Sequence, residues 1–400
     1  MSNKKIQMKQ FIVSLKNKNL MIFISFMVIM IVMGASDSLR GLFALVFQKH
    51  FNLTTTQVSM VITVSYLGNL IFLFFGGSLL DRYHKKKVFI AVLSLWMLGA
   101  VLFVLTDSFP VLLIGMFFCM GASTLINTTI NILVPVIFAA SPGLIVNVLY
   151  FVQGIGTSGS QNVIGRTALN YSSWKMVNII LLVTAFVGAA ILIRSNLPDV
   201  KQEHRKKISY ISIIKTPAFL FLTFLFGLYF VAEHGVLNWL IIYGSGELGL
   251  TTAKASIYLS VFFGGMTIGR LVFAPVVQKF GVTKSIGIFG FTGMIFYVTG
   301  IFLRNGFFLL SISGFGLSIV YPTMVLMIRN FFEKDRIATA TGAIISMATI
   351  FDICFNSIFG KLIDTYGIHR SFYILPVSMA GFCILYLVFI KTVKPLEQAS

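Results

Sequence analysis

Charged residues are scarce in this chain of 400 residues, and acidic ones are the scarcest. Only 11% of the residues are charged, with 12 Asp and Glu against 31 Lys and Arg. A soluble domain carries roughly 25% charged residues, so most of this surface must face lipid instead of water. The formal charge of +19 would suggest nucleic acid on a soluble protein. Here the basic residues lie in short loops between apolar runs, which predicts contact with the lipid bilayer and no nucleic-acid partner.

Residues that carry enzyme or metal chemistry are also few. The three cysteines, Cys119, Cys354 and Cys383, lie inside apolar runs, without the spacing of a disulfide framework or a metal site. Five histidines are scattered, and neither a Ser-His-Asp arrangement, an HExxH motif nor a nucleotide-binding glycine loop is present. We therefore predict that the protein is not an enzyme, holds no cofactor or metal, and draws its energy from a gradient.

Long apolar runs dominate the chain, and the mean hydropathy is +0.92. A bilayer core of about 30 Å needs about 20 apolar residues per helix. Twelve such runs predict an all-α membrane protein with twelve transmembrane helices, and the first run is too long for a cleaved signal peptide. The predicted spans are 20–45, 56–80, 87–106, 110–138, 144–168, 176–195, 216–244, 253–279, 283–303, 307–329, 337–362 and 369–392.

The only long polar stretch, 196–215, separates spans six and seven. It predicts a linker between a six-helix half at 1–195 and a second at 216–400. Related loops follow spans two, five, eight and eleven, which indicates a repeat of three helices. These loops are GSLLDRYHKKK (77–87), GRTALNYSSWK (165–175), APVVQKFGVTK (274–284) and GKLIDTYGIHR (360–370).

The distribution of Lys and Arg predicts the orientation in the membrane. The N-terminus, the loop at 82–87, the linker and the C-terminal residues are rich in basic side chains. The loops on the opposite side of the membrane carry about a third as many Lys and Arg residues. The positive-inside rule therefore places both termini and the linker in the cytoplasm, and we predict a multi-pass protein of the plasma (inner) membrane.

Five charged residues lie in the interiors of the predicted spans, away from their ends: Asp37, Arg40, Glu233, Arg270 and Asp352. A charge at the bilayer centre costs about 2.5–3.5 kcal/mol on insertion scales, so such residues face a cavity or a partner. Spans three, six, nine and twelve have no charged residue in their interiors and are predicted to face lipid. The five interior charges lie in spans one, seven, eight and eleven.

Polar stripes at helical spacing add candidates for substrate binding. Asn127 and Asn131 lie one turn apart in span four, and Asn238 and Trp239 lie in span seven. Amide groups can bind sugar hydroxyls, and an indole ring offers a flat apolar surface to the C–H face of a sugar. A stripe of Ser and Thr alone is more often a contact between helices.

The segment 77–87 resembles the loop 2–3 signature of the major facilitator superfamily, with His84 where that family usually has glycine. The resemblance implies the major facilitator fold of two six-helix bundles, which binds a small-molecule substrate and works by alternating access as a monomer. It also implies a set of gating residues. These are Gly77 for close helix approach, Asp81 near a helix N-terminus, Arg82 and Lys85 on the cytoplasmic face, and Arg270 at the span-eight interface.

Five further segments are similar to the fucose–galactose–glucose/proton symporter family. They are YFVAEHGVLNWLIIY (229–243), FFGGMTIGRLVFAP (262–275), GFGLSIVYPT (314–323), NTTINILVP (127–135) and VNVLYFVQGIG (146–156). This resemblance implies proton-driven uptake of a monosaccharide. The implied substrate-binding residues are Asn127, Asn131, Asn147, Gln153, Asn238, Trp239 and Tyr321. Asn127 stands where fucose permease has an acid, and its span-one acid falls at Gly41 here, so proton coupling cannot be transferred residue by residue.

Glu233 is the first candidate for the transported proton, because an acid in an apolar environment loses its hydration and takes up a proton more readily. Asp37 is the second, since Arg40 at i+3 can hold it ionised. Arg40 can also form a buried charge pair with Asp352. If Arg40 instead faces the cavity, the substrate is a sugar acid or another organic anion.

Efflux of drugs or amphipathic cations is an alternative function. Three buried acids and 41 Phe residues suit such ligands. Against this alternative, span five has Ser160 where the antiporter signature prefers proline.

Overall fold

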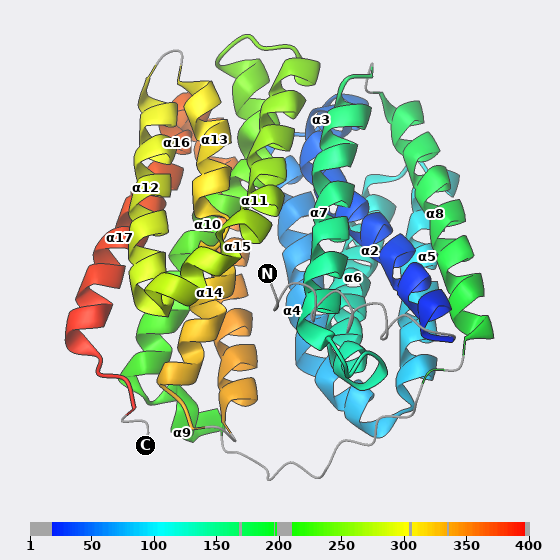
Figure 1. The fold of residues 1–400 in the computed structure, drawn as a ribbon. Coiled ribbons are helices and arrows are strands. Elements are labelled where there is room, and N and C mark those ends of the chain that lie inside the picture. Colours follow the sequence, from blue (N-terminus) through cyan, green and yellow to red (C-terminus); the bar gives the residue numbers. More distant parts are fainter. Residues whose placement is uncertain are drawn as a thin grey trace. The chain divides into compact units, whose positions relative to one another are not determined.

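Regular structure in this protein is entirely helical over the part that the computed structural model describes (Figure 1). Eleven of the described helices are long and apolar enough to cross a membrane. The predicted span 144–168 forms a further helix of 24 residues, α7, which is less apolar. The predicted all-α membrane fold is confirmed. The described residues are 18–167, 170–195, 197, 210–303, 306–333 and 336–396.

The chain divides into two compact units, and α4 is shared between them. The first unit holds α2, α3, α5 to α8 and α4 from Met60 onward. The second holds the later helices and also residues 53–59, which include the first turn of α4. Residues 196 and 198–209 of the predicted linker lie outside the described residues, so the linker stays a prediction.

The helices of the first unit are α2 (Lys18–Leu42), α3 (Ala44–His50), α4 (Thr55–Arg82), α5 (Lys85–Leu105), α6 (Phe109–Ile137), α7 (Pro142–Gly165) and α8 (Tyr171–Arg194). Those of the second are α9 (Tyr210–Ile214), α10 (Pro217–Gly246), α11 (Thr252–Phe280), α12 (Val282–Phe302), α13 (Phe307–Leu317), α14 (Val320–Met327), η1 (Ile328–Asn330), α15 (Ile337–Tyr366), α16 (Ile368–Phe372) and α17 (Ile374–Thr392). The first, tenth and twelfth predicted spans are therefore each interrupted.

Small residues set the packing of the first unit, in which α2 packs against α7 and α8. A Cβ on Gly34 would collide with the main-chain oxygen of Gln153, and one on Gly156 with that of Ile31. Glycine at both positions lets the backbones approach closely, as is common between membrane helices. The Ser38 and Ser160 hydroxyls lie 2.7 Å apart in the same interface.

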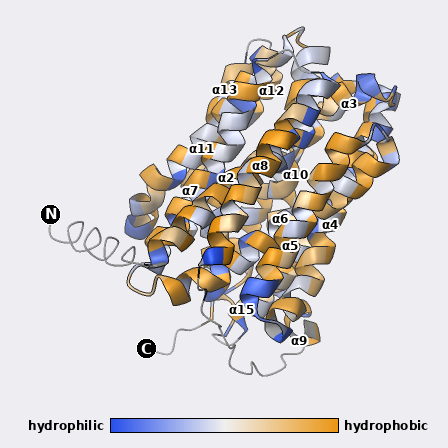
Figure 2. Ribbon diagram, turned by 90° about the vertical axis from the view of Figure 1, so that its right-hand side faces the viewer, coloured by the Kyte–Doolittle hydropathy of each residue, from blue (hydrophilic) through white to orange (hydrophobic). Residues whose placement is uncertain are grey.

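The second unit is organised around α10, which packs against α15, α17 and α11. Most of its side chains are buried, including Trp239 and Glu233. By contrast, outer helices such as α8 expose large apolar side chains, among them Ile180 and Phe186. Figure 2 shows hydrophobic residues along the lengths of the helices, as contact with lipid tails requires.

The first turn of α4 is bound by the carboxylate of Asp364, near the end of α15. Asp364 accepts hydrogen bonds from the Thr55 and Thr56 main-chain N–H groups, at 3.1 and 2.8 Å, and from the Thr56 hydroxyl at 2.6 Å. The first N–H groups of a helix have no partner within the helix, and the helix dipole favours an anion there. A Cβ on Gly360 would meet Ser59, so glycine is needed for this approach.

We predict that Asp364→Ala lowers the free energy of unfolding by about 1 kcal/mol, because loss of a helix cap typically costs this much. Thermal unfolding of the purified protein in detergent measures the effect. Asp107→Ala is the matched control, since Asp107 forms an exposed ion pair with Lys175 at 2.5 Å and such pairs contribute little. An equal melting temperature for Asp364→Ala and the wild type would show that the cap does not stabilise α4.

Candidate substrate and proton site

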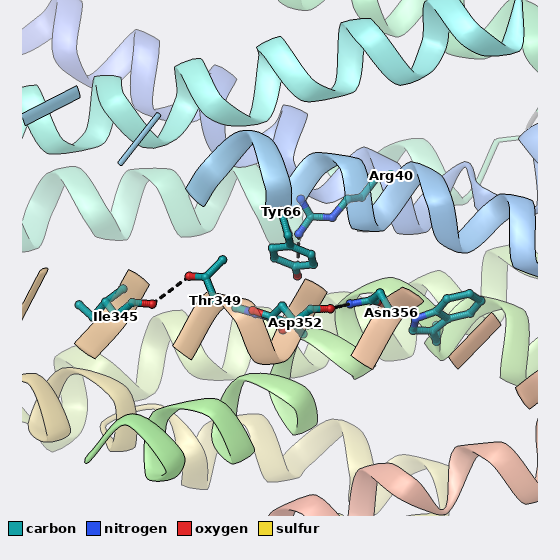
Figure 3. A network of polar contacts seen from close by, with 8 residues as sticks. Arg40, Tyr66, Ile345, Thr349, Asp352 and Asn356 are labelled. Atoms are coloured by element: carbon teal, nitrogen blue, oxygen red, sulfur yellow. Dashed lines mark hydrogen bonds and ion pairs between the residues drawn. The ribbon is translucent and has the colours of Figure 1, made fainter. Parts of the chain in front are cut away.

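Two charged residues of α2 have partners on neighbouring helices of the first unit. The Ser123 hydroxyl donates to Asp37 Oδ2 at 2.9 Å, whereas the buried Oδ1 has no hydrogen-bond partner among the described residues. Arg40 is buried, donates to the Tyr66 hydroxyl at 3.0 Å and lies 3.2 Å from the sulfur of Met120. Figure 3 shows Arg40 beside Tyr66, whose ring centre lies 4.6 Å from the guanidinium. This cation–π contact favours a charged arginine inside the bundle.

The predicted stripe on α6 carries polar groups toward α4 and α7. Asn131 donates to the Tyr150 hydroxyl at 2.6 Å, and Thr124 donates to Asn69 Oδ1 at 2.7 Å. The Oδ1 of Asn127 is buried and has no hydrogen-bond partner in the described part of the chain. A buried amide oxygen without a partner costs free energy, so a ligand that donates a hydrogen bond there would be stabilised.

The other two candidates of the first unit, Asn147 and Gln153, both lie on α7. The side chain of Asn147 is exposed, and Gln153 is partly buried. Gln153 also provides the main-chain oxygen against which Gly34 packs. Its position therefore depends on the contact between α2 and α7.

In the second unit, Trp239, Asn356 and Asp352 form a connected polar layer between α10 and α15. The Trp239 indole N–H donates to Asn356 Oδ1 at 2.8 Å, and Asn356 Nδ2 donates to the main-chain oxygen of Asp352 at 2.8 Å. Figure 3 shows Thr349, Asp352 and Asn356 following one another along α15. Trp239 of α10 and Asn356 and Asp352 of α15 are all buried, so packing on both helices holds this layer in place.

The remaining candidates of this unit differ in their burial. Asn238 is fully buried on α10. Tyr321 on α14 is partly buried and packs its ring against Phe226 and Phe230, with ring centres 5.8 Å apart in each case. Glu233 is buried on α10 and lies close enough to the hydroxyls of Tyr229 and Tyr297 to interact electrostatically with both.

His234 is a candidate site residue that the sequence did not single out. Its Nδ1 lies 2.8 Å from Asp352 Oδ2, so the histidine and the buried acid form a pair between α10 and α15. The sequence offered one signal, because His234 directly follows Glu233 within a predicted span. In the sequence, His234 is one of five scattered histidines. The sequence does not connect it with Asp352, because the two residues are 118 positions apart in the chain.

Two residues of the predicted gating loop have surroundings other than their predicted roles suggested, and these roles stay predictions. A Cβ on Gly77 would meet no atom within 4 Å, and Gly76, one position earlier and on another face of α4, is the one that packs against Leu125. Lys85 is buried and so is not part of a charged surface. Lys86 instead donates to the main-chain oxygens of Ile193 and Ser195, at 2.9 and 2.7 Å, where a cation stabilises the end of α8.

The other gating candidates stay predictions. Arg82 is exposed at the end of α4, and the side chain of Asp81 lies outside the described residues. Arg270 on α11 donates from Nε to the main-chain oxygen of Ser318 at 3.3 Å, between α13 and α14. Because Arg40 and Asp352 belong to different units, their charge pair also stays a prediction.

The arrangement has features of a membrane carrier. Carboxylates and amides lie inside helical units whose outer faces are apolar. No group of three His, Cys, Asp or Glu in the described ranges is placed to hold a metal ion. A family model described as "Major Facilitator Superfamily" matches residues 20–351. The chain belongs to this superfamily. It is a multi-pass membrane transporter that binds a small-molecule substrate, and it is not an enzyme.

Individual members of the superfamily are similar at low identity. The hexuronate transporter of Bacillus subtilis (strain 168) is 22% identical over 87% of this chain and 88% of its own length. A putative glucose/galactose transporter of Helicobacter pylori (strain J99) is 23% identical over 58% of this chain and 57% of its own. The crystal structure of the Escherichia coli fucose:proton symporter superposes with a TM-score of 0.65 at 18% identity, covering 92% of this chain and 98% of that one. The last likeness shows the fold.

We predict that Asn127→Ala raises the apparent KM of this transporter about fivefold, because a hydrogen bond to substrate contributes about 1 kcal/mol. Initial rates of substrate uptake give the KM, and surface expression is measured in parallel. Thr184→Ala is the control, since Thr184 is partly exposed on α8 and donates a hydrogen bond to the Ile180 oxygen of its own helix. Unaltered affinity in both Asn127→Ala and Asn131→Ala would remove α6 from the substrate site.

Proposed function

We propose that this transporter takes up a monosaccharide or a similar small polar solute together with protons. The observation that carries the proposal is the polar layer of Trp239, Asn356 and Asp352, in which an indole and an amide lie next to a buried carboxylate. An indole and an amide suit a sugar. A buried carboxylate suits a proton.

The relatives support the choice of sugar. The names of two of them refer to hexuronate and to glucose or galactose, and the fucose:proton symporter has the same fold. The amides of Asn127 and Asn131 on α6 are separate candidates for hydrogen bonds to a sugar within the first unit. In alternating access, each unit contributes contacts that differ between the two states of the carrier.

The proton supplies the energy in this proposal. One charge crossing about 100 mV releases about 2.3 kcal/mol. This corresponds to accumulation of about 50-fold, because about 1.4 kcal/mol is a factor of ten. The buried acids Asp37, Glu233 and Asp352 are the candidates for carrying the proton, and the monomer is the proposed working unit.

Uptake of a sugar acid is the second candidate function, and Arg40 favours it. Its guanidinium is buried in α2 beside Tyr66, and arginine binds carboxylates through two parallel hydrogen bonds. The hexuronate transporter, which aligns with most of this chain, agrees with an anionic sugar. In this variant of the proposal, Arg40 holds the carboxylate of the substrate.

We predict saturable, proton-driven accumulation of one sugar class in proteoliposomes that contain the purified protein. Radiolabelled glucose, galactose, fucose, glucuronate and galacturonate are each offered with and without an inwardly directed proton gradient. The transported sugar should accumulate only with the gradient, and an uncoupler should abolish the accumulation.

The panel also separates the alternatives. Uptake restricted to the two uronates selects the sugar-acid function, and Arg40→Gln should then abolish it. Ethidium is included as an amphipathic cation. Gradient-driven ethidium efflux without any sugar uptake would overturn both sugar proposals.

The orientation in the plasma membrane is tested by single-cysteine labelling in a cysteine-free background. Cysteines next to Lys18, Arg205 or Glu397 should be protected from an impermeant maleimide in intact cells, because the positive-inside rule places them in the cytoplasm. Cysteines next to Lys49 in α3 or Lys254 in α11 should be labelled. Labelling next to Arg205 in intact cells would invert the proposed topology.

A further inference from the structure

We propose that His234 and Asp352 together form the group that binds and releases the transported proton. This inference rests on the proposed proton-coupled function and names its coupling residues. The sequence had directed attention to Glu233 and Asp37, and the geometry of the second unit points to a different pair.

The pair has the placement that such a group needs. His234 Nδ1 lies 2.8 Å from Asp352 Oδ2, within the contact between α10 and α15. The side chain of Asp352 is 1% exposed, whereas that of His234 is 25% exposed. The histidine is therefore the accessible member and the carboxylate the buried one. The second carboxylate oxygen, Oδ1, is buried without a hydrogen-bond partner in the described part of the chain.

The charges of the pair explain why it would bind a proton. When Asp352 is ionised and His234 is neutral, Nδ1–H donates to Oδ2 and the pair carries one negative charge. A proton added to Nε2 gives an imidazolium next to a carboxylate, and the net charge falls to zero. A neutral pair is less costly inside a membrane than a single charge. Loss of the same proton from Nε2 restores the starting state, so no other reactant is needed.

The other titratable groups around α10 are placed differently. Glu233 is the next residue before His234, and successive residues of a helix point about 100° apart. It lies against Tyr229 and against Tyr297 of α12. Arg270 of α11 interacts electrostatically with Tyr229. His234 instead packs its ring against Phe230, with ring centres 5.0 Å apart.

The remaining helices that contact α10 add few ionisable groups near the pair. Tyr321 of α14 also packs against Phe230. α16 brings His369 to Glu247, which follows the end of α10. α17 contributes the neutral Ser378, which donates to the main-chain oxygen of Leu228. The described side chains of α9 are not ionisable. Asp352 is thus an ionisable group in direct hydrogen-bonding contact with His234.

The pair is also connected to a candidate substrate contact. The main-chain oxygen of Asp352 accepts a hydrogen bond from Asn356, whose own oxygen accepts one from Trp239. A shift of α15 that accompanies protonation would move Asn356 relative to Trp239 of α10 and so change the hydrogen bond between them. Binding of proton and substrate would then favour each other equally, as linkage requires.

The test measures accumulation and exchange separately in proteoliposomes, with the sugar that the wild type transports. His234→Gln and Asp352→Asn should reduce gradient-driven accumulation from up to about 50-fold to about 1-fold. Both variants should still exchange labelled for unlabelled sugar across the membrane, which also shows that they are folded. Sugar-induced proton uptake, followed with a pH dye, should disappear in both, and their exchange rates should no longer depend on pH.

His369→Gln is the matched control, because His369 also pairs with an acid, Glu247, at 3.1 Å but on the exposed surface. It should accumulate sugar like the wild type. Wild-type accumulation in His234→Gln, or full coupling in Asp352→Asn, overturns the assignment of the proton to this pair. If Glu233→Gln is the only uncoupled variant, the proton site is Glu233 instead. A wild-type protein that transports sugar without any effect of the proton gradient overturns both this inference and the proposed proton coupling.

Discussion

The hydrocarbon core of a bilayer cannot hydrogen-bond to protein, and this constraint explains the main features of the structure. Main-chain groups must be paired within each segment, so the described chain is helical. Hydroxyl side chains obey the same rule by bonding to the preceding turn. Thr128 donates to the oxygen of Thr124, Thr129 to that of Leu125, and Ser65 to that of Val61. Such residues are satisfied within their own helix, so their presence does not by itself indicate a binding site.

Polar side chains that bond to a different helix form a smaller group. In the first unit, Asp37 bonds to Ser123 and Arg40 to Tyr66. In the second unit, His234 bonds to Asp352, and Trp239 bonds to Asn356. These contacts keep ionisable groups within an apolar bundle at a cost that packing must offset. Each unit therefore has its own buried acid with a partner on a neighbouring helix.

The sequence predicted the helical spans well, because repeated apolar runs of about 20 residues are typical of membrane-spanning helices and rare in soluble domains. It also singled out Trp239 and Asp352 as candidates, since polar groups in a membrane helix are rare, and their roles stay predictions. It could not predict which faces meet. The pairing of His234 with Asp352 depends on how α10 packs against α15. Whether Gly76 or Gly77 contacts Leu125 depends on the rotation of α4 about its axis. Both are properties of tertiary packing that a periodic pattern specifies to within a residue or two at best.

The three tryptophans of the protein are all fully buried, but their indole nitrogens differ. Those of Trp96 and Trp174 have no hydrogen-bond partner among the described residues, whereas that of Trp239 donates to Asn356. The first two belong to the first unit, and Trp239 belongs to the second. Trp239 is thus an intrinsic fluorophore whose indole is bonded directly to the polar layer. With Trp96 and Trp174 replaced by phenylalanine, the tryptophan emission of this transporter would come from that layer alone, without an attached dye.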